Sequence, residues 1–244
     1  MSERRVLVLA ILAVGTVAAW VAVARLPLPA RALTAFLLVP LPAFMRWQAR
    51  RAESLADVVP RTGLYLGSAL LLWTLAALVG VTAAAAHLSL ADLGLTAPGL
   101  AVGVAWTAGT FAAGVAVLLL GRLVGMAETP MVRRLIPVTG VEKLAFGCLS
   151  LTAGFAEELI FRGFLLWALL QASSSAAISV VASSAVFGIL HAYQDVSGAA
   201  RAAVLGAILA TPVLATGSIL PSMVAHAAID LTSGLVLARW LLGD

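Results

Sequence analysis

Apolar runs long enough to cross a bilayer follow one another along almost the whole chain, and this feature constrains the fold more than any other. A helix needs about 20 predominantly apolar residues, at 1.5 Å each, to span the hydrocarbon core. Only 11% of the 244 residues are charged, whereas an ordinary soluble domain is about 25% charged. The runs cover residues Val6–Ala24, Ala32–Met45, Leu64–Ala86, Leu100–Gly121, Leu144–Leu170, Ser174–Tyr193, Ala202–Leu220 and Pro221–Leu242. We therefore expect an all-α fold, a polytopic transmembrane helical bundle of about eight spans.

The positions of the basic residues predict how the chain is oriented. If the N-terminus lies inside, twelve of the 15 Lys and Arg residues flank the inner ends of the runs, two flank the outer ends, and Arg162 lies within a run. Such an excess is typical of the cytoplasmic side. We expect a multi-pass integral protein of a bacterial inner membrane with both termini in the cytoplasm. The arginines lie between apolar runs and form no polar face, so the bilayer is the expected partner and nucleic acid is excluded.

Two acidic residues and one basic residue interrupt the fifth run in "GFAEELIFRGF", residues 154–164. One charge at a helix centre costs about 3 kcal/mol on insertion scales, so such residues need compensation or a function. Glu158 and Arg162 are four residues apart, share a helix face and are expected to form a structural ion pair. Glu157 lies about 100° around the helix and faces Phe161 one turn later, which cannot neutralise it. An apolar setting makes such a carboxylate more basic, as a general base near neutral pH requires.

Three further polar residues lie in the last runs. His191 ends "VFGILHAY", and His226 and Asp230 share a face in "MVAHAAIDL". Helical bundles build interior sites from side chains of several helices, so we expect these residues and Glu157 to line a polar pocket among the last four spans. The run boundaries place them at different depths, and helix tilt must bring them together.

Three ordered motifs carry a resemblance to a known family. "EELIFR" fits EExxxR, "FGILH" fits FxxxH, and "HAAID" occupies the place of HxxxN. Over residues 150 to 235 the chain resembles the CPBP family of intramembrane proteases (CAAX protease and bacteriocin-processing, or ABI). Residues 1–140 carry no such motif, and residues 141–244 are expected to form the catalytic core within a single membrane domain.

The resemblance implies an intramembrane endopeptidase that hydrolyses a peptide bond of a membrane-associated peptide or membrane protein. Glu157 and His191 would activate water, whereas His226 and Asp230 would stabilise the oxyanion. Glu158 and Arg162 would brace the helix. A non-catalytic scaffold or bacteriocin-immunity protein of the same fold is the alternative, and a proton-coupled transporter is a third option because membrane acids also serve proton relays.

Asp230 stands where the family pattern has asparagine, and this leaves two chemistries open. A protonated Asp230 donates a hydrogen bond to an oxyanion, whereas an ionised one repels it. Alternatively, His191, His226 and Asp230 supply three ligands to one Zn²⁺, with Glu157 as base for the bound water. Ser222, His226 and Asp230 also follow one another at helical spacing, but this serine has no evident oxyanion donors and is better explained as a cap or packing residue.

Overall fold

The computed structural model describes residues 3–49, 58–126 and 128–242, and every regular element within these ranges is a helix. The expected all-α transmembrane bundle is therefore confirmed. Two of the basic residues counted on the inner side, Arg50 and Arg51, and both chain ends lie outside the described residues.

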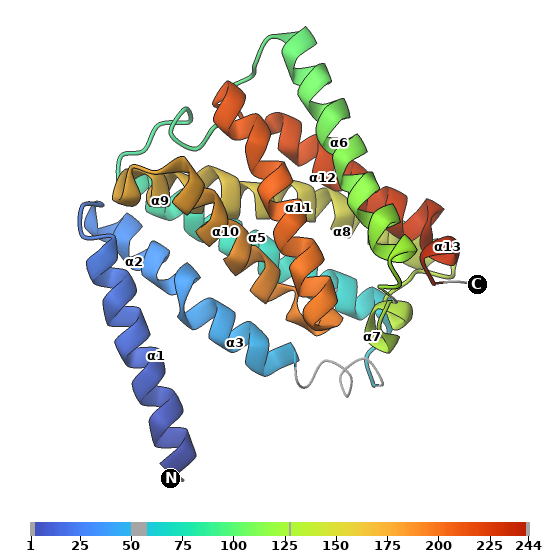
Figure 1. Cartoon of the computed structure of the whole chain (residues 1–244), viewed down its shortest axis with the longest axis horizontal. Coiled ribbons are helices and arrows are strands. Elements are labelled where there is room, and N and C mark those ends of the chain that lie inside the picture. Colours follow the sequence, from blue (N-terminus) through green and yellow to red (C-terminus); the bar gives the residue numbers. More distant parts are fainter. Residues whose placement is uncertain (1–2, 50–57, 127, 243–244) are drawn as a thin grey trace.

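The first half of the chain forms the flanks of the bundle (Figure 1). α1 lies along one edge beside α2 and α3, and α6 lies along the opposite edge against α11 and α12. α5 packs with one face against α8. The bounds are α1 Glu3–Ala22, α2 Leu28–Leu38, α3 Pro40–Ala49, α5 Arg61–Ala85, α6 Leu100–Leu123 and α7 Pro130–Arg134.

The second half holds all the polar motif residues. α8 packs against both α5 and α12, and α10 packs along α11. The bounds are α8 Gly140–Glu158, a π-helical segment η1 Leu159–Leu165, α9 Leu166–Ser173, α10 Ala176–Leu190, a 3₁₀ turn η2 Ala192–Gln194, α11 Asp195–Thr216, α12 Leu220–Leu231, a second π-helical segment η3 Thr232–Val236, and α13 Ala238–Leu242.

Each predicted run overlaps one apolar helical segment, but the segments differ in length. Five are long and apolar enough to cross a membrane: Leu28–Ala49, Arg61–Ala85, Leu100–Leu123, Gly140–Ser173 and Ala192–Thr216. Three are shorter: Leu7–Ala22, Ala176–Leu190 and Leu220–Val236. The figure of eight crossings is not confirmed and stays a prediction.

Local sequence explains two of the helix boundaries. Val39 separates α2 from α3 with φ −129° and ψ −64°, directly before Pro40, which has no amide hydrogen to continue the helical hydrogen bonds. α8 begins at a capping box in which the Thr139 hydroxyl accepts from the Glu142 amide and the Glu142 carboxylate accepts from the Thr139 amide. This reciprocal pairing satisfies two amides that the first turn leaves open.

The core is built around the π-helical segment η1, which continues α8 directly after Glu158. All seven residues of η1 are buried, and Ile160, Phe164 and Leu165 have no exposed surface. π-helical turns are uncommon and often occur at functional sites. Glu157 and Glu158 thus lie where the helix changes its winding.

The loop between α5 and α6 folds back over η1 and the start of α12. Ile219 N donates to Gly94 O at 2.9 Å, and Leu93 is buried. Gly94 has φ +66°, which a side chain would strain. Within this loop the Ser89 hydroxyl and amide donate to Asp92, and these bonds hold the pKa of Asp92 below its ordinary value.

Candidate active site

Glu158 is the central residue of the polar cluster. Its side chain has no exposed surface, and its Oε1 accepts from Arg162 Nη1 at 2.9 Å. The i, i+4 pair expected from spacing is thus present in the structure. The same oxygen also accepts from His226 Nδ1 at 2.7 Å, a contact with α12 that spacing within α8 and η1 cannot reveal. Glu158 therefore joins two helices as well as two turns of one helix.

The hydrogen bond to Glu158 fixes how the His226 ring is used. A carboxylate that also binds an arginine acts as acceptor, so Nδ1 of His226 carries the hydrogen. The other ring nitrogen, Nε2, lies 3.8 Å from Glu157 Oε2 and 3.8 Å from Asp230 Oδ2. His226 is thus placed between the two carboxylates that the sequence singled out. The structure brings Glu157, His226 and Asp230 together.

Glu157 has a carboxylate oxygen that is free to accept a hydrogen bond. Its side chain is 15% exposed, and its Oε2 is buried without a hydrogen-bond partner among the described residues. A buried unpartnered acceptor in a native fold calls for an explanation such as a catalytic role or a water. A carboxylate that is open on one side is what water activation requires.

His191 lies at the C-terminal end of α10 and faces the cluster across Phe187. Its Nδ1 is 2.8 Å from Phe187 O. A carbonyl can only accept, so Nδ1 carries the hydrogen and Nε2 of the neutral ring is left as an acceptor. The Phe187 ring lies 4.6 Å from the His191 ring and 6.0 Å from the His226 ring. No ion pair joins His191 to an acid in the described part of the chain, whereas His226 lies near three carboxylates.

Two further residues, Phe187 and Gly206, lie next to the buried Arg162 guanidinium. The Arg162 guanidinium lies 4.3 Å over the Phe187 ring, a cation–π arrangement that helps offset burial. A Cβ added at Gly206 would come within 3.1 Å of Arg162 Nη2. The absence of a side chain on α11 therefore leaves room for this guanidinium. Only Phe187 had a sequence signal, since it begins the FxxxH pattern.

α10, the helix that ends before His191, is shorter than the predicted run Ser174–Tyr193. α10 has 15 residues and is about 22 Å long at 1.5 Å per residue, whereas the hydrocarbon core is about 30 Å thick. α10 is thus shorter than a full span, and His191 at its end need not lie at the depth that the run Ser174–Tyr193 suggested.

Ser222 does not take part in the cluster. It is fully buried, and its hydroxyl donates to Leu209 O on α11 at 2.7 Å. No hydrogen bond joins it to His226 among the described residues. This contact is that of a packing residue, as expected.

To hold one zinc ion, His191, His226 and Asp230 would each have to direct a free donor atom toward the same point. His226 Nδ1 is bound to Glu158, and only Nε2 faces Asp230. Within the described ranges, no three His, Cys, Asp or Glu side chains are grouped so that they could hold a metal ion. The donor set of His191, His226 and Asp230 therefore does not fit a three-ligand site as arranged here.

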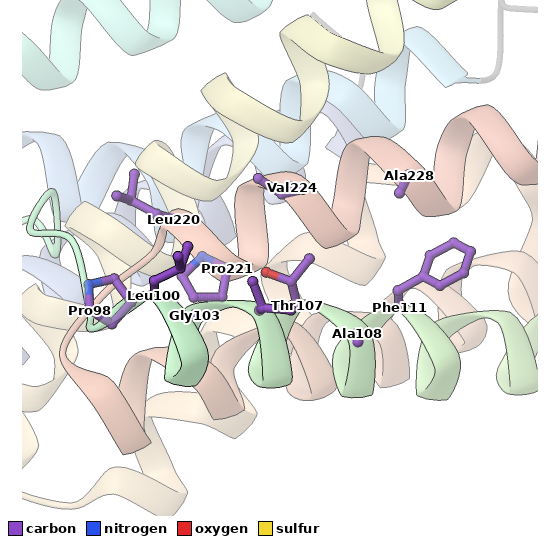
Figure 2. A pocket seen from close by; sticks show the side chains of 11 residues that line it. Pro98, Leu100, Gly103, Thr107, Ala108, Phe111, Leu220, Pro221, Val224 and Ala228 are labelled. Atoms are coloured by element: carbon purple, nitrogen blue, oxygen red, sulfur yellow. The ribbon is translucent and has the colours of Figure 1, made fainter.

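A groove of about 560 Å³ lies between the N-terminal half of α6 and α12 (Figure 2). Its lining is apolar except for Thr107, and on α12 it includes Leu220, Val224 and Ala228. Val224 and Ala228 are each two residues from His226, about 200° around the helix. The groove is thus on the face of α12 opposite the cluster. It is not the polar pocket expected from the sequence, which stays a prediction.

Comparison with known proteins agrees with the three motifs. Residues 140–232 match the family model described as type II CAAX prenyl endopeptidase Rce1-like. No curated protein and no solved structure matches the chain. The matched segment runs from the start of α8 to the end of α12 and contains Glu157, His191, His226 and Asp230. This match, over residues 140–232, confirms the resemblance to the CPBP family that the motifs indicated.

Proposed function

We propose that this protein is an intramembrane endopeptidase in which Glu157 and His191 activate a water molecule and His226 and Asp230 stabilise the transition state. The observation that carries the proposal is the position of His226 Nε2, 3.8 Å from both Glu157 Oε2 and Asp230 Oδ2. A base and an electrophilic group thus lie side by side within a membrane-spanning fold. The family match supports a membrane endopeptidase at the level of the family.

Glu157 is the general base of the proposed reaction. Its unpartnered Oε2 accepts a proton from the water as the water oxygen attacks the carbonyl carbon. His191 orients the same water through Nε2, because its Nδ1–H is donated to Phe187 O. In its protonated form, His226 donates through Nε2 to the developing oxyanion. Such a bond is stronger in a water-poor site than in bulk solvent.

Glu158 and Arg162 position the reacting groups without touching the substrate. Glu158 holds the His226 ring through Nδ1, and Arg162 supplies the countercharge that a buried carboxylate needs. We propose that residues 141–244 form the catalytic core and that residues 1–140 pack around it. The substrate is a membrane-associated peptide or protein, and the prenylated C-terminal tail in the family's name is the substrate class to test first.

Glu157→Gln is the deciding variant. Quenched fluorescent CAAX peptides, farnesylated and unmodified, are offered to the full-length protein in detergent and in proteoliposomes. Removal of a general base lowers kcat by about 10²- to 10⁴-fold, and we expect a loss in this range. Glu142→Gln is the matched control, because Glu142 caps the same helix at its other end and its loss changes stability without touching the cluster.

Several outcomes separate the proposed endopeptidase from its rivals. Equal cleavage by the wild type and Glu157→Gln would contradict the proposal. A partner-binding phenotype that survives Glu157→Gln, with no cleavage by either form, would favour a scaffold or immunity protein. Loss of proton-coupled flux without proteolysis would indicate a transporter. Turnover lost on chelation, together with one tightly held zinc by mass spectrometry, would support the metal-dependent version.

A further inference from the structure

The candidate site has more acceptors than donors. Glu157 and an ionised Asp230 offer only acceptor oxygens, and His191 offers an acceptor nitrogen because its Nδ1–H is bound to Phe187 O. Arg162 donates to Glu158 through Nη1, and its Nη2, which has no hydrogen-bond partner among the described residues, lies beside Gly206 on α11. An oxyanion needs hydrogen-bond donors, and among these residues His226 supplies one only when its ring is protonated. A neutral donor near His191 would complete the site.

Tyr193 carries such a donor and lies two residues after His191, in the turn η2. Its ring centre is 6.0 Å from that of His191, with an interplanar angle of 33°. The chain contains two tyrosines, and the other, Tyr65, is bound through its hydroxyl to Leu135 O at 2.7 Å.

The hydroxyl hydrogen of Tyr193 is not used in a hydrogen bond within the described residues. Gln194 Nε2 donates to the phenolic oxygen at 3.0 Å. That bond uses the oxygen as acceptor and leaves the O–H free. No acceptor for this hydrogen is found among the described residues.

The residues that follow Tyr193 are fixed by hydrogen bonds and by close packing. Asp195 adopts φ +73°, a conformation that costs a non-glycine residue free energy and recurs at functional sites. Its Oδ1 accepts from Gly198 N at 2.9 Å and from Ser197 Oγ at 2.8 Å, which secures the first turn of α11. A Cβ added at Gly198 would lie 2.4 Å from Gln194 Cβ. Gln194, which donates to the phenolic oxygen, thus packs directly against Gly198, where a side chain would clash.

We propose that Tyr193 is a further catalytic residue, whose phenolic O–H donates a hydrogen bond to the oxyanion of the scissile carbonyl. The inference rests on the proposed endopeptidase function. Glu157 takes a proton from water while the water oxygen bonds to the carbonyl carbon, and the carbonyl π electrons move onto the carbonyl oxygen. Tyr193 and His226 hold that oxyanion. When the C–N bond breaks, the C=O bond re-forms and the proton on Glu157 passes to the leaving nitrogen. Tyr193 keeps its own proton throughout.

Tyr193→Phe tests this role, because it removes the hydroxyl and keeps the ring against His191. Steady-state cleavage of the farnesylated CAAX peptide is measured with the full-length protein in proteoliposomes. Loss of one oxyanion donor lowers kcat by about 100-fold or more, and we expect a fall of this size with KM nearly unchanged. The thermal midpoint should stay at the wild-type value. Tyr65→Phe is the matched control and should keep the wild-type kcat.

The outcomes distinguish failure of this inference from failure of the proposed function. If Glu157→Gln is inactive and Tyr193→Phe has the wild-type kcat, Tyr193 has no catalytic role and the endopeptidase proposal stands. A rise in KM alone, or a lowered thermal midpoint that accounts for the lost activity, would also overturn the role of Tyr193. Wild-type cleavage no greater than that of Glu157→Gln would overturn both.

Discussion

At the scale of single residues, Glu158 decides the geometry of the site although it was expected only to brace a helix. The i, i+4 spacing to Arg162 is a local property, so the sequence was sufficient to predict that pair. The bond to His226 joins residues 68 positions apart, and no periodicity encodes it. The same holds for Gly206, whose missing side chain makes room for Arg162 from a different helix.

Variants of Glu158 separate its two contacts. Glu158→Gln leaves the buried Arg162 without a countercharge, and breaking a buried pair in this way costs about 3 kcal/mol of stability or more. We expect a lower thermal midpoint in detergent and a large loss of cleavage. In the double variant Glu158→Leu with Arg162→Met the buried charge is gone, so stability should recover while cleavage stays low, since His226 has lost its partner. Recovery of both would show that Glu158 does not position His226.

At the scale of helices, the sequence predicted where helices occur better than how each helix is wound or how long it is. The apolar runs located the helical segments, and the Thr139–Glu142 box marks the start of α8. The π-helical winding of η1 was not predictable, because the residues Leu159 to Leu165 would suit an α-helix equally well. The short length of α10 depends on the turn at Ser174 and Ser175 before it and on the 3₁₀ turn η2 after it, both of which the predicted run Ser174–Tyr193 partly included.

The contact between α8 and α12 sets the distance from Glu157 to His226. A Cβ added at Gly154 would meet Met223 O at 2.7 Å and Ala227 Cβ at 2.8 Å. Gly154→Ala should therefore push the helices apart, lower stability by about 2 kcal/mol, and reduce kcat by about 10- to 100-fold through misplacement of Glu157.

Gly147 lies on the same helix about two turns earlier and offers a matched control. A Cβ there would touch only Leu231 Cδ2 at 3.8 Å, an ordinary contact. Gly147→Ala should keep wild-type cleavage and thermal midpoint. Equal effects of the two alanines would show that the α8–α12 approach does not control the site.

At the scale of the whole molecule, composition predicted the membrane class, and the helical bundle confirms it. The charge distribution predicted an inside N-terminus and inside C-terminus, which stays a prediction. The cost of burying charge led us to expect that four polar residues from three spans converge, but their placement depends on the three-dimensional packing of α8, α10 and α12.

Activity should depend on the thickness of the bilayer. The 15-residue α10 is shorter than an average hydrocarbon core, and a short hydrophobic stretch is accommodated by local thinning of the lipid. We expect faster cleavage in proteoliposomes of short-chain phosphatidylcholine than in long-chain ones, at equal reconstitution. A rate independent of acyl length would contradict this.

If the bilayer thins beside the short helix α10, the headgroup layer and the water that it holds lie closer to His191. For the proposed endopeptidase, the surrounding lipid would then be part of the route by which water reaches the site, and the composition of the host membrane would influence the rate.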